Sequence, residues 1–218
     1  MAKQIIISLL FIWPYVCFGQ GTSYLSTLNN PNNGGATPVA SDQWAAELFQ
    51  TGTAQSGYFL NSIELSMSEA DFKANGFSVS LYSDNSGSPG NYLNTLNGSS
   101  NPSSGIYTYN ASNFILLPTT SYWVVVNAGT PYSTGVFYLN CTVSFTASYT
   151  SSDNWSIPGF PGLSYAISSD GGSSWGMPGY LALFTVNATM VPEPTNLAFI
   201  GLGLTFLWTA RQSQKNKS

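Results

Sequence analysis

The chain has 218 residues, and only 6% of them are charged, about a quarter of the share that is usual in soluble domains. It contains no histidine, which excludes Ser-His-Asp and Cys-His nucleophiles and removes the commonest metal ligand. Between residues 20 and 190 stand eight acidic residues and one lysine, a net charge of −7 that argues against nucleic acid as a partner.

The N-terminus has the layout of a secretory signal peptide. Lys3 precedes an apolar run over residues 5–13, and small residues stand at positions −3 and −1 before Gln20. The alternative is a buried N-terminal strand or helix. We expect export through the Sec translocon and removal of residues 1–19.

The region that follows predicts short strands and few helices. Residues 20–42 are expected to be a flexible lead-in, because Asn, Gly and Pro dominate residues 29–38. From 43 to 190, apolar and polar residues alternate frequently. Strands are predicted at 58–67, 77–81, 106–109, 122–126, 136–145, 165–167 and 180–186, with Gly-, Pro- and Asn-rich turns between them. This pattern is typical of an all-β fold with a single β-sandwich or jelly-roll domain.

Several segments of this region resemble the choice-of-anchor R domain of bacterial surface proteins. They are residues 77–84, 87–90, 116–125, 153–156 and 168–175, within a match from 43 to 188. The resemblance implies a secreted β-domain at the cell surface and brings no enzymatic activity with it.

The C-terminal segment predicts an attachment to the membrane. Pro192-Glu193-Pro194 precedes an uncharged apolar stretch over residues 195–210, and the basic residues Arg211, Lys215 and Lys217 follow it. As a helix the stretch would be roughly 24 Å long, a little short of the ~20 residues that normally cross a bilayer. The basic end would stay cytoplasmic. A plain C-terminal anchor explains the helix and the charges but not the Pro-Glu-Pro motif.

The order of motif, helix and basic end over residues 191–218 resembles the PEP-CTERM sorting signal of Gram-negative bacteria. The resemblance implies that an exosortase, a membrane enzyme, recognises the tail and cleaves it near the motif. It also implies transient anchoring in the inner membrane, followed by a location at the cell surface or outside the cell. The exosortase system generally accompanies exopolysaccharide production, which makes an exopolysaccharide a candidate partner.

Two kinds of residue are candidates for ligand binding. Trp44, Trp123, Trp155 and Trp175 could form a sugar-stacking platform, although aromatic residues in β-proteins more often pack in the core. Asp84 and Asp170 lie in tight turns and could bind calcium, although a turn-forming Asp bonded to its own backbone is the favoured alternative. No other cofactor is expected. Residues 168–175 also resemble the Asp-box, a structural hairpin turn of sialidases.

A pair of acids is the remaining chemical possibility. Glu69 and Asp71 are close in sequence, with Glu47 and Glu64 nearby, and paired carboxylates can hydrolyse glycosides. Solvated surface acids are the alternative. The sequence favours a non-catalytic, exported structural protein of the extracellular matrix, followed by a carbohydrate-binding module and then by an acid-pair glycoside hydrolase.

Overall fold

The computed structural model describes residues 21–192, and this part of the chain consists of strands, turns and one short 3-10 helix, η1 (Ser144–Thr146). No helix within it is both long enough and apolar enough to cross a bilayer. The strands are β1 (Thr22–Ser26), β2 (Gly35–Val39), β3 (Trp44–Gln50), β4 (Tyr58–Ser68), β5 (Ser78–Asp84), β6 (Pro89–Leu96), β7 (Gly105–Leu116), β8 (Ser121–Asn127), β9 (Phe137–Val143), β10 (Thr150–Ser151), β11 (Tyr165–Ser168), β12 (Tyr180–Ala182) and β13 (Phe184–Met190).

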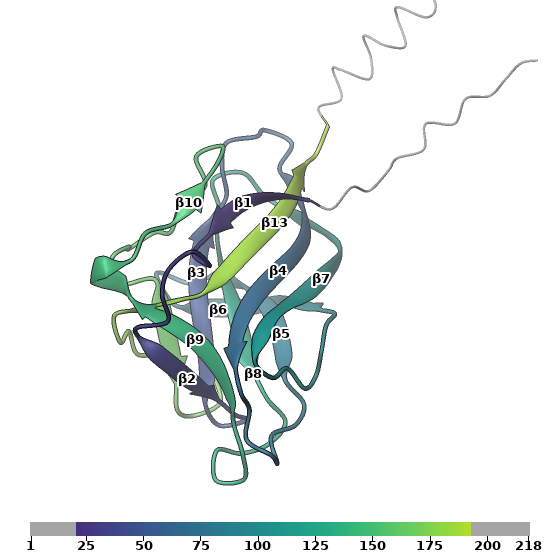
Figure 1. Cartoon of the computed structure of the whole chain (residues 1–218). Helices are drawn as coiled ribbons and strands as arrows, with labels where there is room; N and C mark the ends of the chain where they lie inside the picture. The colour runs from purple at the N-terminus through teal and green to yellow at the C-terminus, as the bar shows by residue number, and fades with distance from the viewer. Residues whose placement is uncertain (1–20, 193–218) are drawn as a thin grey trace, which may run out of the picture.

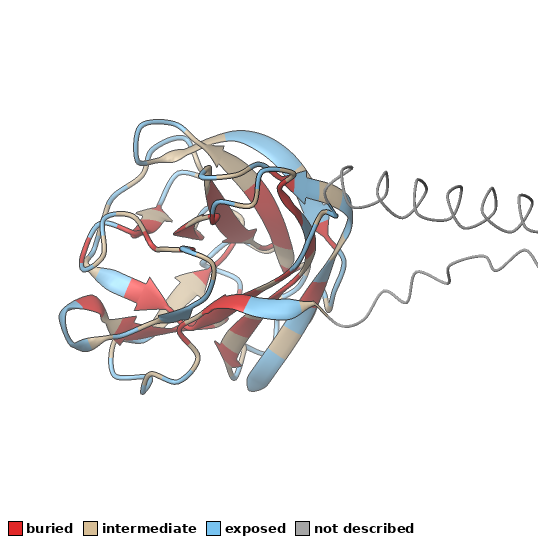
Figure 2. Ribbon diagram, turned by 90° about the horizontal axis from the view of Figure 1, so that it is seen from above, coloured by how far each residue is buried: buried red, intermediate tan, exposed pale blue. Residues whose placement is uncertain are grey.

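The strands form two antiparallel sheets that pack face to face (Figure 1). We call them sheet A, with the order β10-β1-β13-β4-β9-β12 and with β2 on β9 and β7 on β4, and sheet B, with the order β11-β3-β8-β5-β6. Seen from above, the buried residues gather between the two layers (Figure 2). The predicted all-β, sandwich-like class is therefore confirmed.

An aromatic cluster joins the two sheets at one end of the core. Trp155, from the segment between β10 and β11, stacks on Tyr24 of β1 with ring centroids 5.1 Å apart and on Phe49 of β3 at 5.8 Å. It meets Tyr58 of β4 edge-on at 5.0 Å. Offset and edge-on aromatic pairs add stabilisation beyond the burial of their area. Trp155 therefore fastens sheet A to sheet B at this end.

The prediction of a flexible lead-in over residues 20–42 is wrong, because this segment supplies two strands of sheet A. β1 pairs with β13, and its Leu25 is fully buried. β2 pairs with β9 alone, an edge position that tolerates Pro38. The Asn- and Pro-rich residues 28–34 turn the chain between β1 and β2. The folded unit thus starts at Thr22 and not at residue 43.

The beginning and the end of the folded unit lie side by side. Thr22 of β1 is paired with Ala188 of β13, and the last backbone hydrogen bond runs from the Val191 N–H to the Gly57 carbonyl oxygen, at 3.0 Å. Pro192 follows directly after this bond. The signal peptide 1–19, motif residues Glu193 and Pro194, helix 195–210 and basic residues Arg211, Lys215 and Lys217 all lie outside the described residues.

Candidate binding groove

A row of irregularities crosses sheet A and opens a gap in it. Asn61 of β4 is an extra residue relative to β13, and on the other side of β4 it faces three residues of β7, 111–113. Two strands away, Tyr24 is an extra residue of β1 relative to β13. Bulges bend strands and increase their local twist. Asn113 completes the bulge of β7 with a φ of 51°, a left-handed conformation that Asn tolerates better than most residues.

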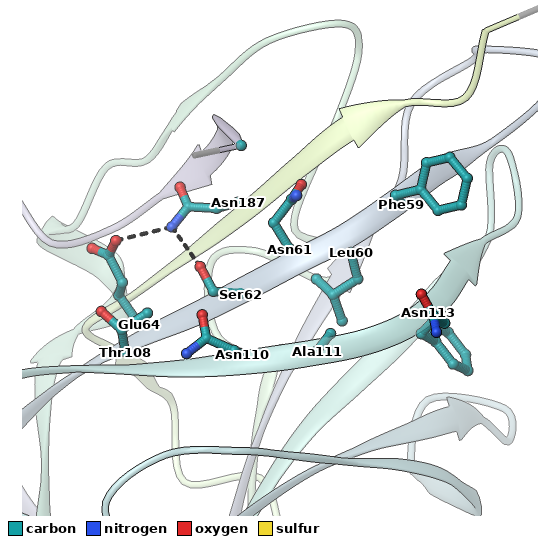
Figure 3. A pocket seen from close by; sticks show the side chains of 12 residues that line it. Phe59, Leu60, Asn61, Ser62, Glu64, Thr108, Asn110, Ala111, Asn113 and Asn187 are labelled. Carbon is teal, nitrogen blue, oxygen red and sulfur yellow. Dashed lines mark hydrogen bonds between the residues drawn. The ribbon is translucent and has the colours of Figure 1, made fainter. Parts of the chain in front are cut away.

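The gap forms a groove of about 700 Å³ on the outer face of sheet A (Figure 3). It is lined by residues of β4, β7 and β13 and by Gly21: Phe59, Leu60, Asn61, Ser62, Glu64, Thr108, Asn110, Ala111, Asn113, Phe114 and Asn187. The half-buried or buried side chains of Leu60, Ala111 and Phe114 give the groove an apolar floor where the strands part. The amide side chains form most of its rim.

Hydrogen bonds hold part of this rim in place. The Asn187 Nδ2 donates to Glu64 Oε1 at 2.9 Å and to Ser62 Oγ at 3.1 Å, and the Thr189 hydroxyl donates to Asn61 Oδ1 at 3.0 Å. These bonds leave the Glu64 Oε2 and the Asn61 Nδ2 without a partner within residues 21–192. The groove therefore offers both a pre-positioned acceptor and a pre-positioned donor.

Two further amides face the groove with free hydrogen-bonding groups. The side chains of Asn110 and Asn113 are exposed and make no hydrogen bond to the described part of the chain. Glu64 is the one carboxylate among the lining residues. Lys73, the one cation of residues 21–192, is not among them. The rim therefore disfavours an anionic ligand, and its amides suit an uncharged polar one.

The four predicted sugar-stacking tryptophans do not form a platform. Trp123 and Trp155 are 0% and 2% exposed, so neither ring can meet a sugar, and for these two residues the prediction is wrong. Trp44 and Trp175 are half-buried on the outer face of sheet B, on the opposite side of the molecule from the groove. The sequence could not separate these cases, because the burial of each tryptophan depends on which other segments pack against it.

The outer face of sheet B is apolar and covered. Its centre consists of Ala46, Leu48, Trp123, Val125 and Ala166, and Trp44, Tyr82, Trp175 and Met177 pack over them. Trp175 and Met177 belong to the segment 168–177, a hairpin closed by paired backbone hydrogen bonds between Ile167 and Gly176. This covering hairpin buries Trp123 on a face that would otherwise meet solvent.

Asp170 closes the covering hairpin from within. Its Oδ1 accepts the Ser168 hydroxyl at 2.7 Å and the Ser174 N–H at 2.9 Å, and its Oδ2 accepts the Ser174 hydroxyl at 2.5 Å. These bonds lower the pKa of the Asp170 carboxyl to about 2, with those from Ser174 and Ser168 as the main causes. The bonding agrees with the structural role that the Asp-box resemblance implies.

Asp84 is engaged in the same way. Its Oδ1 accepts the indole N–H of Trp123 at 2.8 Å and the Gly87 N–H at 3.1 Å. The carboxylate oxygens of both calcium candidates thus accept hydrogen bonds from neighbouring groups of the fold. No group of three or more potential metal ligands occurs within residues 21–192.

The candidate acids are not assembled at one place. Glu69 and Asp71 lie exposed between β4 and β5, where Glu69 accepts the Ser103 hydroxyl at 3.0 Å and Asp71 accepts the Val136 N–H at 3.1 Å. Neither lines the groove. Of the four acids considered, Glu64 alone reaches it.

Glu47 is buried between the two sheets. It is 2% exposed, its Oε2 accepts the Ala182 N–H at 2.7 Å, and its Oε1 has no partner in the described structure. Burial raises the pKa of the Glu47 carboxyl well above its usual range, because the charged form loses its water. Its neighbours include the Tyr165 hydroxyl and the Cys141 thiol. Glu47 is thus an interior group without access to a substrate.

No protein-family model, curated protein or solved structure matches the chain. Function is therefore argued from the geometry of the folded unit and of its groove.

Proposed function

We propose that the chain is an exported bacterial protein of the cell surface or extracellular matrix, with a non-catalytic role, and that it is the substrate of an exosortase-type sorting enzyme. The observation that supports this most is the position of the two expected processing points. Cleavage before Gln20 would fall two residues ahead of β1, and cleavage near Pro192 would fall just beyond β13. Both cuts would spare every strand of residues 21–192.

The pairing of β1 with β13 brings the two expected processing points to the same end of the sandwich. Since Thr22 and Ala188 are neighbours, both processed ends leave the sandwich from the same end. A helix over residues 195–210 would hold that end toward the inner membrane until cleavage. The chain would then be released or attached with its fold complete.

Intact mass spectrometry of the surface fraction tests the sorting step. In an exosortase-containing host, we expect a mature chain that ends near Val191. A Glu193→Ala variant should keep residues 211–218, whereas a matched Glu69→Ala variant should be processed normally. A wild-type chain that retains residues 211–218 at the surface would instead establish a permanent anchor.

The groove supports polysaccharide binding as a second function of the same protein. Ligand sites combine apolar surface with a few precisely placed polar groups. A sugar suits such a site because it presents hydroxyl groups that form hydrogen bonds and C–H faces that are apolar. The groove offers free amides at Asn110 and Asn113, the Glu64 Oε2 as an acceptor, and the partly exposed ring of Phe59 at its edge. With a carboxylate in it and no cation lining it, the groove suits neutral rather than acidic chains.

Co-sedimentation with exopolysaccharide from the producing cells tests this binding. An Ala111→Trp variant, which fills the groove, should bind at least tenfold more weakly than the wild type. Asn91→Ala, on the exposed part of β6, should bind normally. Equal binding by all three proteins would remove the groove as the site. Variants of Trp123 or Trp155 are unsuitable here, because their loss would disturb the fold.

A further inference from the structure

We infer that the groove selects N-acetylated amino sugars, with the acetamido group seated where β4 and β7 part. This inference rests on the proposed binding of neutral polysaccharide and makes it specific. The feature behind it is the pairing of an apolar floor with free amides at one end of the groove (Figure 3).

The floor accounts for the methyl group. Leu60 is paired with Phe114, and Ala111 belongs to the bulge of three residues, 111–113, opposite the single residue Asn61. Leu60 is 3% exposed, so the half-buried Ala111 and Phe114 supply most of the accessible floor. A regular ladder would have closed this gap with a cross-strand pair. A hydroxyl group placed on such a floor would lose its hydrogen bonds to water, whereas a methyl group gains from burial there.

The amides account for the polar half of the acetamido group. Asn61 is not the donor here, because its amide lies on the β13 side of β4 and accepts the Thr189 hydroxyl. Asn110 lies on β7 beside Ala111, and its side chain has no partner in the described chain, so its Nδ2 can donate to a carbonyl oxygen (Figure 3). The Asn113 side chain has no partner in the described chain, and its Oδ1 can accept an amide N–H. An acetamido group needs one donor and one acceptor beside an apolar surface, and this end of the groove supplies all three.

The other end of the groove is suited to the hydroxyl groups of the sugar ring. It is lined by Ser62, Glu64, Thr108 and Asn187, and the Glu64 Oε2 is free to accept a hydrogen bond from a hydroxyl group. The Glu64 carboxylate disfavours uronic acids, since no cation within the lining offsets it. A free amine on the sugar would have to lose its water on the apolar floor, which is costly for a charged group.

Matched pairs of simple sugars test the inference, with the full chain as the protein. The methyl glycosides of glucose and N-acetylglucosamine differ only at carbon 2, and so do those of galactose and N-acetylgalactosamine. NMR titration should give at least tenfold tighter binding for the acetamido member of at least one pair, with shifts at Asn110 and Asn113. The methyl glycoside of glucosamine should bind more weakly than its acetylated form.

Two variants and one control locate the effect. Ala111→Leu fills the floor and should reduce acetamido binding about tenfold while leaving the plain sugar little affected. Asn113→Gly removes the amide but keeps the left-handed backbone, so it should lower the preference even if Ala111→Leu folds poorly. Asn91→Ala should change nothing.

The outcomes separate the two proposals. Equal binding of both members of each pair would overturn the acetamido inference and leave polysaccharide binding intact. Tightest binding by the glucosamine glycoside would overturn it too. If no glycoside binds but the native polysaccharide does so through the groove, the inference fails alone. If the polysaccharide also fails to bind, both proposals fail.

Discussion

The outer faces of the two sheets differ in a way that explains where this protein can bind a ligand. The outer face of sheet B is apolar. Trp175 and Met177 of the covering hairpin, together with Trp44 of β3 and Tyr82 of β5, close it into a second small core. The outer face of sheet A carries Ser, Thr and Asn side chains and is open at the groove. Aromatic content thus marks the closed face, and uncharged polar content marks the open one.

The largest expected effect tests whether the closed face is a true core. Trp123→Ala should lower the free energy of unfolding by about 3–5 kcal/mol, because it leaves a cavity and removes the partner of Asp84. Denaturant unfolding followed by circular dichroism measures it. A loss below about 1 kcal/mol would mean that the packing of the hairpin on sheet B adds little to stability. The outer face of sheet B would then not be a core.

Glu47 lies between the two sheets and belongs to neither outer face. It should dominate the way in which the free energy of unfolding changes with pH. Its pKa is raised in the folded protein, so the folded state binds the proton more tightly than the unfolded chain. The contribution of Glu47 to stability should be fully present below its ordinary pKa of about 4.3 and should be lost as the pH rises through the raised pKa of the folded state. Glu47→Gln keeps an acceptor for the Ala182 N–H and should be more stable than the wild type at pH 8, by on the order of 1 kcal/mol.

Unfolding curves at several pH values measure this effect. The wild type should lose stability above its optimum, and Glu47→Gln should lose much less. Glu64→Gln, in the open groove, is the matched control and should follow the wild type. A wild-type profile as flat as that of Glu47→Gln would show that Glu47 stays ionised without penalty.

The covering hairpin should open locally when Asp170 is removed or protonated. Because the pKa of Asp170 is lowered to about 2, its contribution is present above the ordinary value near 3.8 and is lost as the pH falls through about 2. Asp170→Ala should therefore speed chymotrypsin cleavage after Trp175 severalfold at neutral pH. Cleavage after the exposed Phe72 should stay unchanged. Unaltered cleavage after Trp175 would show that packing alone holds the hairpin.

The smallest stability effects are expected on the open face. Asn110→Ala should change the free energy of unfolding by less than about 0.5 kcal/mol, because its side chain is exposed and makes no hydrogen bond to residues 21–192. Denaturant unfolding beside a polysaccharide binding assay checks both properties. A loss of several kcal/mol would place the open face among the structural elements and contradict the contrast with sheet B.

The sequence predicted the fold class from strands in which apolar and polar residues alternate. Residues 77–81 alternate clearly, and the structure has β5 over Ser78–Asp84, although Ser80 is buried there as well as Val79 and Leu81. Residues 44–50 do not alternate, because both faces of β3 are covered, one by the core and the other by the hairpin. β1 and β2 were not predicted, because the Asn- and Pro-rich turn that joins them indicated a flexible segment.

The groove was less accessible to sequence reasoning than the fold. Its one local signal is a break in the pattern of strand 58–67, where Asn61-Ser62, two polar residues in succession, follow three apolar residues and precede regular alternation, which indicates a bulge. The floor of Leu60, Ala111 and Phe114 depends on the register between β4 and β7, which no local pattern specifies. Likewise, composition suggested the tryptophans as ligand contacts, while their burial depends on tertiary packing.

The neighbourhood of β13 also governs how the domain would respond to mechanical force. β13 is hydrogen-bonded to β1 on one side and to β4 on the other, and the chain leaves it at Pro192 along the strand direction. A pull applied there would load both ladders in shear, so that many hydrogen bonds resist together and none is peeled off first. A domain held by this end in flowing water would therefore be tethered through a strand that is hydrogen-bonded along both of its edges.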